Sequence, residues 1–202
     1  MRGWLRRPMA WWALLVLGCV PLSDLVWRTL ADQLGANPAE TLIRATGDWA
    51  IRGLCLTLAV TPLRTVLGWP ELARFRRLLG LLTFAYAALH LLCYAWFDMG
   101  LDWDDIAQDI AKRPFILVGF SAMLILLALA ATSFNRAIRW LGAARWQALH
   151  RAVYAAAALA VLHFWWMRSG KRLYGEVLVY AAILALLLGW RVLRKLNKRR
   201  SG

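Results

Sequence analysis

The sequence has few acidic residues and few cysteines. Asp and Glu number 11 against 25 Lys and Arg, which gives a formal net charge of +14. The three cysteines, Cys19, Cys55 and Cys93, stand singly in apolar stretches, without a CxxC pair and without the spacing of a metal site. We therefore interpret them as small buried hydrophobic side chains.

Motifs of soluble redox domains are also missing. No GxGxxG turn opens a helix, and the chain has no internal repeat, no low-complexity linker and no loop long enough to fold as a domain. The sequence therefore predicts a single domain over residues 1–202. Any nucleotide chemistry is expected to come from a partner.

What the chain has in excess is apolar surface. Hydrophobic residues make up 61% of the sequence and 13 residues are Trp, well above the usage of water-soluble domains. Apolar runs of roughly 20 residues, the length that crosses a ~30 Å hydrocarbon core, recur along the sequence. The sequence predicts an all-α polytopic membrane protein, a bundle of six transmembrane helices over residues 11–30, 49–67, 78–97, 115–134, 146–167 and 177–192.

The placement of the charges predicts orientation. A basic chain with many aromatic residues can indicate nucleic-acid binding, but here the basic residues cluster between apolar runs, so no nucleic-acid partner is expected. One side of the six-span arrangement holds 17 of the 25 Lys and Arg, and Glu71 is the only acidic residue on that side. We therefore predict a bacterial inner-membrane protein with both termini cytoplasmic and the acidic segment from Asp98 to Asp109 outside.

The first apolar run has a second interpretation. It follows Arg2, Arg6 and Arg7 and so resembles a signal peptide. No small-residue cleavage site follows Cys19, and the run continues past Pro21. We expect it to be kept as the first span.

Three histidines are the chemically distinctive residues of the apolar runs. His90 lies deep in the third run and His163 deep in the fifth, each without a neighbouring charge. Ionisable side chains inside a membrane usually bind something or line a path, and imidazoles from facing helices are standard axial ligands of b-type haem. His90 is 14 residues beyond Arg76 and His163 is 13 beyond His150, so two parallel spans carry them at matching depth, nearer the outer face. We predict that His90 and His163 hold one haem b.

Two alternatives stay open. Each histidine can instead make a hydrogen bond between helices, a common use of polar side chains in membrane bundles. His150 lies at the cytoplasmic edge of the fifth run, where it can face water or ligate the iron of a second, inner haem. Against an inner haem, the matching position on the third run is Arg76, a poor metal ligand, and an ideal helix sets His150 about 140° around from His163.

The residues resemble a known family over nearly the whole chain. His90, His150 and His163 stand where the MsrQ (YedZ) family, a part of the ferric-reductase-like transmembrane group, has its haem-associated histidines, and Arg76 stands at the family's arginine. The segments that carry the resemblance are TGDWAIRGLCLTLAVTPLR (46–64), RRLLGLLTFAYAALHLLCY (76–94), KRPFILVGF (112–120) and WQALHRAVYAAAALAVLHFWW (146–166).

The resemblance implies an electron-transfer subunit with haem b and FMN as cofactors. It implies that electrons come from the quinone pool or a cytosolic flavin reductase. They pass to MsrP, a periplasmic molybdenum-containing subunit that reduces methionine sulfoxide in oxidised proteins. The acidic segment is a candidate docking surface for that partner, or a solvated loop. Candidates for a flavin phosphate are the basic residues Arg74, Arg76, Arg77, Arg139 and Arg145, although positive charge on the cytoplasmic side needs no ligand.

Two other functions fit parts of the pattern. A stand-alone transmembrane ferric or quinone reductase, with no dedicated protein acceptor, would use the same haem. A non-redox transporter or assembly factor would use the histidines as proton relays or helix bridges, and would be expected to carry intramembrane carboxylates or broken helices. Apart from Asp24 beside Pro21, the sequence has little of either.

Overall fold

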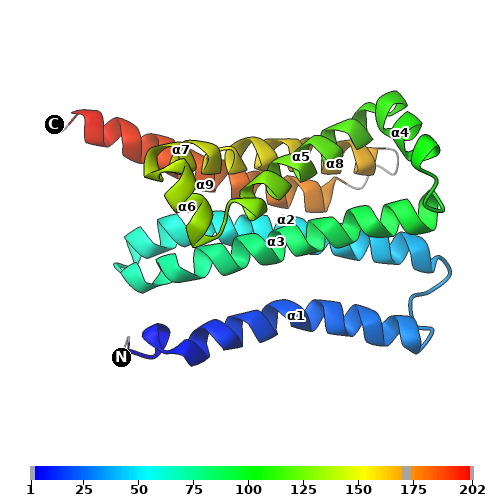
Figure 1. The fold of residues 1–202 in the computed structure, drawn as a ribbon, viewed down its shortest axis with the longest axis horizontal. Coiled ribbons are helices and arrows are strands. Elements are labelled where there is room, and N and C mark those ends of the chain that lie inside the picture. Colours follow the sequence, from blue (N-terminus) through cyan, green and yellow to red (C-terminus); the bar gives the residue numbers. More distant parts are fainter. Residues whose placement is uncertain (1–2, 170–173, 201–202) are drawn as a thin grey trace.

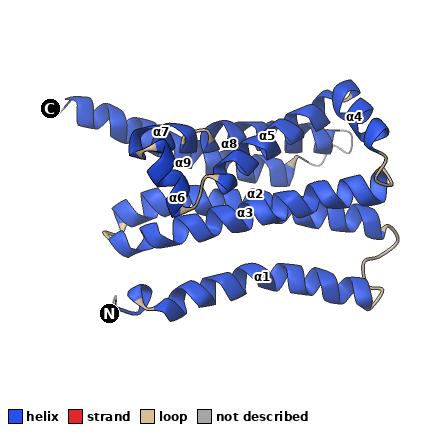
Figure 2. Ribbon diagram, viewed as in Figure 1, coloured by secondary structure: helices blue, strands red, loops and turns tan. Residues whose placement is uncertain are grey.

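The chain folds as a helical bundle. A computed structural model describes residues 3–169 and 174–200, and all regular secondary structure in these residues is helical (Figure 2). The long helices lie roughly parallel to one common axis, and the chain reverses direction between consecutive ones (Figure 1). They are α1 (Pro8–Leu30), α2 (Pro38–Val66), α3 (Phe75–Cys93), α5 (Pro114–Ala131), α8 (Val153–Ser169) and α9 (Gly175–Arg200).

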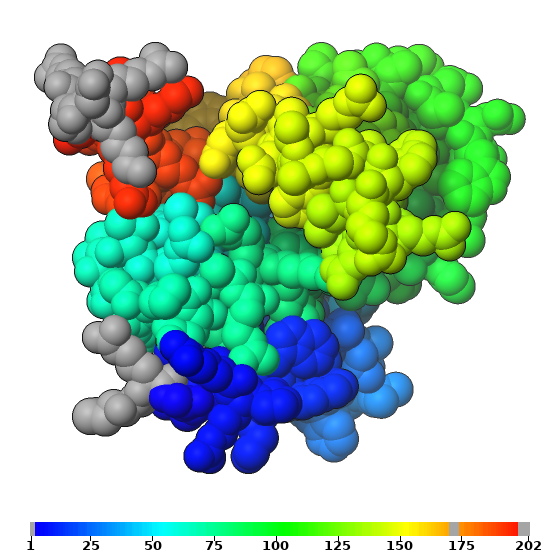
Figure 3. Space-filling model, turned by 60° about the vertical axis from the view of Figure 1, so that its left-hand side comes forward, coloured from blue at the N-terminus to red at the C-terminus, as the bar shows by residue number. Residues whose placement is uncertain are grey.

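Shorter elements join the long helices. The π-helix η3 (Tyr94–Asp98) extends α3, and α4 (Trp103–Lys112) leads into α5 at one end of the bundle. At the other end lie α6 (Asn135–Leu141), α7 (Ala143–His150) and the 3₁₀ helices η1 (Gly3–Arg6) and η2 (Pro70–Arg74). In Figure 3 the yellow-green α6–α7 segment covers part of that end, beside the red residues of α9.

The helices begin where the local sequence favours a start. Pro8, Pro38 and Pro114 occupy the first turns of α1, α2 and α5, where a missing backbone N–H costs nothing. Asn37 caps α2 by accepting a hydrogen bond from the Glu40 backbone N–H, and similar caps are common where short polar side chains precede a helix. These signals start α2 at Pro38, well before the apolar part of the helix.

The centre of the bundle is α2. It packs most extensively against α3 and also contacts α9 and α8, while α5 pairs with α8. The core cluster of Leu54, Cys55, Leu58, Ala157 and Leu184 joins α2, α8 and α9. By contrast, α1 makes few contacts and lies at the edge of the bundle (Figure 1).

The protein is a multi-pass membrane protein. Large apolar side chains are exposed around the bundle, for example Leu30 at 79% and Leu186 at 74%, and such a surface needs lipid rather than water. In the described part of the chain, five helical stretches are long and apolar enough to cross a membrane. These stretches are Pro8–Leu30, Pro70–Asp98, Pro114–Ala131, Ala143–Ser169 and Gly175–Asn197.

The helix α2 is the expected span that does not meet this standard. Polar residues such as Arg44, Asp48 and Arg52 lower its hydropathy. Two of these groups have partners: Arg44 pairs with Glu40 on the partly exposed surface of α2 itself, while Asp48 lies 3.9 Å from Arg168 of the neighbouring α8, where both side chains are largely buried. An interior helix therefore needs a less apolar sequence than one that faces lipid.

The helix bounds differ from the expected span bounds at several places. The expected second span began at residue 49, but α2 begins at Pro38, since its polar first turns lack the apolar signal used to find it. The segment 98–109 was expected as a loop, yet most of it belongs to η3 and α4, where Asp102 caps the helix by accepting hydrogen bonds from two backbone N–H groups. The expected fifth span is interrupted, because α7 ends at His150 and α8 starts at Val153.

Candidate haem-binding site

Two of the three histidines meet inside the bundle. His90 lies near the end of α3 and His163 near the end of α8. Their ring centroids are 6.2 Å apart, with an angle of 74° between the ring planes. The matching depth expected from the sequence is thus observed for these two residues.

Each of the two rings is held by a backbone carbonyl. Nδ1 of His90 donates to the carbonyl oxygen of Ile43 at 2.8 Å, and Nδ1 of His163 donates to that of Phe115 at 2.7 Å. A carbonyl can only accept, so the proton of each neutral imidazole is on Nδ1. Nε2 of each ring is left with a free lone pair, and no hydrogen bond to either Nε2 is found among the described residues.

This geometry fits a metal with two axial imidazole ligands. An imidazole nitrogen binds a metal ion at about 2 Å, so two rings that ligate one iron from opposite sides have centroids roughly 6 Å apart. Each ring can turn about its own bond to the metal, and the 74° angle between them is therefore compatible with shared ligation. Carbonyl acceptors on the far nitrogen are the usual outer partners of metal-bound histidine.

The histidine pair does not form a site for a bare metal ion. The described residues contain no group of three or more His, Cys, Asp and Glu side chains that could hold one. Two imidazoles with ring centroids 6.2 Å apart instead suit a metal whose other four ligands come from a macrocycle. The residues present therefore fit haem better than they fit a protein-only metal centre.

An ionic cluster lies one turn beyond His163. The guanidinium of Arg168 is 3.0 Å from Glu176 and 3.9 Å from Asp48, and its side chain is only 12% exposed. Nearby, Nε of Arg52 donates to the Tyr180 hydroxyl at 2.9 Å. These contacts tie α2, α8 and α9 together beside the histidine pair.

His150 lies apart from that pair. It ends α7, and its ring stacks on Trp146 with centroids 4.0 Å apart. Nε2 of His150 is 3.1 Å from the hydroxyl of Thr132, while the Trp146 indole N–H donates to the Thr132 carbonyl at 2.8 Å. Among the described contacts, those of His150 are with this local cluster and not with His90 or His163.

Arg76 and its neighbours line the other end of α2. Arg76 donates to the Thr61 hydroxyl at 2.9 Å, and Arg194 donates to Thr65 at 2.7 Å. Further along α2 toward its middle, Arg191 donates to the Leu58 carbonyl at 2.6 Å. Three guanidinium groups therefore follow one face of α2.

Two further arginines of this region have structural partners. Arg74 donates to the carbonyl oxygens of Leu5 and Arg6, which fixes the start of the chain against η2. Arg77 donates to the Asn135 side chain at 3.1 Å and so holds α3 to α6. These hydrogen bonds give Arg74 and Arg77 a structural role that requires no bound ligand.

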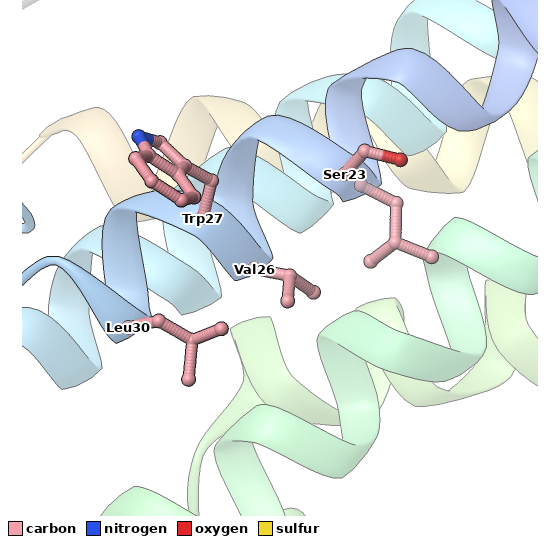
Figure 4. A pocket seen from close by; sticks show the side chains of 5 residues that line it. Ser23, Val26, Trp27 and Leu30 are labelled. Carbon is pink, nitrogen blue, oxygen red and sulfur yellow. The ribbon is translucent and has the colours of Figure 1, made fainter.

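A shallow groove on α1 is separate from all of these groups. In Figure 4, Val26 and Leu30 extend from α1 into the groove, which Leu22, Ser23 and Trp27 also line. No charged side chain or histidine belongs to this lining. An apolar groove at the edge of a membrane bundle is suited to lipid chains.

Some features of the site were not found from the sequence. The acceptors for His90 and His163 are backbone carbonyls, which leave no side-chain signature in a sequence. Gly47 and Gly119, which lie against the two rings, give a weak signal as glycines within helical runs. Asp48 and Arg168 are charged residues close to apolar runs, and in the sequence they are the clearest indication of the ion pair between α2 and α8.

Comparison with known proteins gives the family. The family described as ferric reductase like transmembrane component matches residues 46–161, which includes His90 and His150. A protein of Polaromonas naphthalenivorans named "Protein-methionine-sulfoxide reductase heme-binding subunit MsrQ" is 60% identical over 189 residues, 94% of this chain and 86% of the relative. The chain belongs to the MsrQ family.

Other MsrQ proteins are similarly close. The one from Bordetella pertussis is 51% identical over 179 residues, 89% of this chain and 86% of the relative. The one from Azospira oryzae is 50% identical over 185 residues, with 92% and 79% covered. No solved structure matches the chain.

Proposed function

We propose that this MsrQ-family chain binds one haem b between His90 and His163 and carries electrons across the bacterial inner membrane. The facing of the two rings, each with its Nδ1 bonded to a carbonyl, is the observation that carries the proposal. The names of the relatives, which describe haem-binding subunits of a methionine sulfoxide reductase, support it.

The residues of the site have separate tasks. The carbonyls of Ile43 and Phe115 fix the tautomer of the two imidazoles and leave both Nε2 atoms free to bind a metal. Contacts between the two helix pairs, α3 with α5 and α2 with α8, set the separation of the rings. The bound haem supplies a one-electron carrier, which these side chains alone do not provide.

The position of the pair suits delivery to the outer side. In the proposed topology α2 also crosses the membrane, which brings the number of crossings to six and puts both ends of the chain in the cytoplasm. In support, α1 begins and α9 ends at the same end of the bundle, where the basic residues gather (Figure 1). His90 precedes Asp98 by 8 residues, about 12 Å along a helix, so the pair lies close to the outer face.

The electron acceptor is proposed to be a periplasmic molybdenum-containing methionine sulfoxide reductase of the MsrP type. The surface of this chain that would dock the acceptor is the outward face of α4. Asp104 and Asp105 are exposed there beside Trp103, which is 73% exposed. Asp109 is not part of this surface, because it pairs with Arg113 and accepts a hydrogen bond from Tyr94. Exposed charge of one sign mainly speeds encounter with a partner of the opposite sign.

The electron donor is proposed to be quinone or a cytosolic flavin reductase, acting at the basic end. FMN is proposed on the family resemblance. Of the five arginines considered for its phosphate, Arg74, Arg76 and Arg77 already have hydrogen-bond partners within the chain, so Arg139 and Arg145 are the better candidates. A second haem at His150 would require its Nε2 to exchange the Thr132 hydroxyl for iron.

The test is a dithionite-reduced minus oxidised absorption spectrum of the full chain purified in detergent, with pyridine-haemochrome quantification against protein. One b-type haem per chain is the expected result. Two per chain would bring His150 into ligation. A colourless protein, after expression with ample haem supply, would overturn the proposal and return the histidines to a packing or proton-transfer role. Reduction of ferric chelates without any protein acceptor would favour a stand-alone reductase.

A further inference from the structure

The two histidines sit in equivalent surroundings built from different helices. His90 donates to the carbonyl of residue 43, four positions before Gly47, and His163 donates to the carbonyl of residue 115, four positions before Gly119. The separations along the chain are 47 and 48 residues. The same unit of carbonyl, glycine and histidine therefore occurs twice.

Both glycines are in direct contact with the rings. A Cβ built on Gly47 would be 3.0 Å from Nδ1 and 3.1 Å from Cε1 of His90. On Gly119 it would be 2.7 Å from Nδ1 and 2.8 Å from Cε1 of His163. A methyl group at position 119 would force the His163 ring to shift, and one at position 47 would require the His90 ring to give by a few tenths of an ångström.

The four-residue spacing has a physical reason. A helical side chain leans toward the N-terminus and covers the turn before its own Cα. A residue larger than glycine at position 47 would therefore cover the carbonyl of Ile43, and one at 119 would cover that of Phe115. Glycine leaves each carbonyl open to an imidazole from the neighbouring helix.

We infer that Gly47 and Gly119 are positioning residues that set the orientation of the two axial histidines. The inference rests on the proposed haem ligation. A free imidazole could turn away from an added methyl group at little cost. A ring fixed at once by iron, by its own Cβ and by the carbonyl bond cannot, so the bond to Nδ1 or the bond to iron must distort.

The test compares Gly47→Ala and Gly119→Ala with two matched controls in the full-length, haem-loaded chain. Gly80 lies in α3, and a Cβ there would meet only a Thr57 methyl group at 3.9 Å. Gly53 lies in α2, and a Cβ there would crowd the Thr83 hydroxyl at 2.7 Å, away from both histidines. Gly80→Ala thus controls for the added methyl group and Gly53→Ala for crowding between helices.

The readouts are the haem-to-protein ratio, the low-spin electron paramagnetic resonance spectrum and the midpoint potential. We expect Gly119→Ala to lose most of its haem. Gly47→Ala, with the looser contact, should keep haem but show shifted low-spin signals and a shifted potential. Both controls should resemble the wild type. Because alanine favours helix more than glycine does, the helical content of all four variants should be preserved.

Two results would overturn the inference. One is wild-type haem content and spectra in both Gly47→Ala and Gly119→Ala. The other is an equal loss of haem in Gly53→Ala, which would show that crowding between helices is the cause. Failure of the proposed function looks different: the wild type would carry no haem, or His90→Ala and His163→Ala would keep its spectrum.

Discussion

The hydroxyl of Tyr94 donates a 2.7 Å hydrogen bond to the carboxylate of Asp109, which joins the end of the third long helix to α4. The Asp109 side chain is only 11% exposed and also pairs with Arg113. This bond fixes α4 against the bundle at the end where the histidine pair lies.

Tyr94→Phe should therefore loosen α4. A hydrogen bond to a charged group contributes about 1.5 kcal/mol or more, so backbone amides of α4 should exchange with deuterium roughly tenfold faster. Hydrogen exchange followed by mass spectrometry measures this directly. Asp105→Asn, an exposed change in the same helix, serves as the control. Unchanged exchange in Tyr94→Phe would mean that α4 is held by other contacts.

Removing either ring of the pair should remove the haem. His90→Ala and His163→Ala each take away one of the two facing imidazoles, so we expect most of the b-type absorbance to be lost in both. His150→Ala should be milder if one haem is bound, because His150 contacts Thr132 and Trp146 instead. Absorption spectra of the purified variants decide this. A normal low-spin spectrum in either of the first two variants would exclude the pairing.

Arg191 should be important for stability. Its guanidinium donates to the Leu58 carbonyl and to the Tyr154 hydroxyl, both at 2.6 Å, and so links α9 to α2 and α8. Arg191→Leu should lower the free energy of unfolding by about 2 kcal/mol or more, through the loss of charge-assisted bonds. Arg191→Lys should recover only part of this, since one ammonium cannot replace a planar fork.

Thermal or denaturant unfolding in detergent, followed by circular dichroism, measures the Arg191 effect. Arg139, exposed in the short helix α6, offers a matched Arg→Leu control. An equal loss of stability in both variants would contradict a specific role for Arg191.

Charge on α4 should control the rate of docking. Asp104→Asn with Asp105→Asn removes two exposed negative charges without touching the Asp102 cap. The association rate with a basic periplasmic reductase should fall roughly tenfold at low salt and much less at high salt, since screening removes the steering. Stopped-flow mixing at two ionic strengths measures it, with Asp32→Asn as the control. A rate independent of these residues at low salt would assign docking to another surface.

The topology can be tested with reporter fusions. In the six-crossing arrangement a periplasm-dependent phosphatase should be active when fused after Gly100 and inactive when fused after Gly202. A fluorescent protein that matures only in the cytoplasm should show the reverse pattern. With the N-terminus in the cytoplasm, the reversed pattern, with phosphatase inactive after Gly100 and active after Gly202, would mean that α2 does not cross.

The meeting of His90 and His163 could be predicted because parallel spans carry them at nearly equal distances from the basic ends. The contact of His150 with Thr132 could not. The angle of about 140° between His150 and His163 was predicted for one ideal helix from 146 to 167, whereas α7 ends at His150 and α8 starts at Val153. A local break of this kind depends on tertiary packing, which changes helix ends more than it changes the presence of a helix.

The start of α2 was missed for a different reason. Apolar periodicity finds helices that face lipid, but α2 lies among other helices and pairs part of its charge with them, as Asp48 does with Arg168 of α8. The capping signal at Asn37 and Pro38 was present in the sequence. A prediction from hydropathy alone does not use this capping signal.

The division of the histidine pair between two helix hairpins bears on how the protein is assembled in the membrane. One imidazole and its carbonyl belong to residues 43–90, and the other set belongs to residues 115–163. Each hairpin supplies only one of the two imidazoles, so tight binding of a ligand by both requires that the hairpins have already docked. A ligand that binds only the docked form also stabilises it by mass action. Capture of the cofactor would thus act as a late checkpoint in biogenesis, separating completed bundles from those that quality-control proteases should remove.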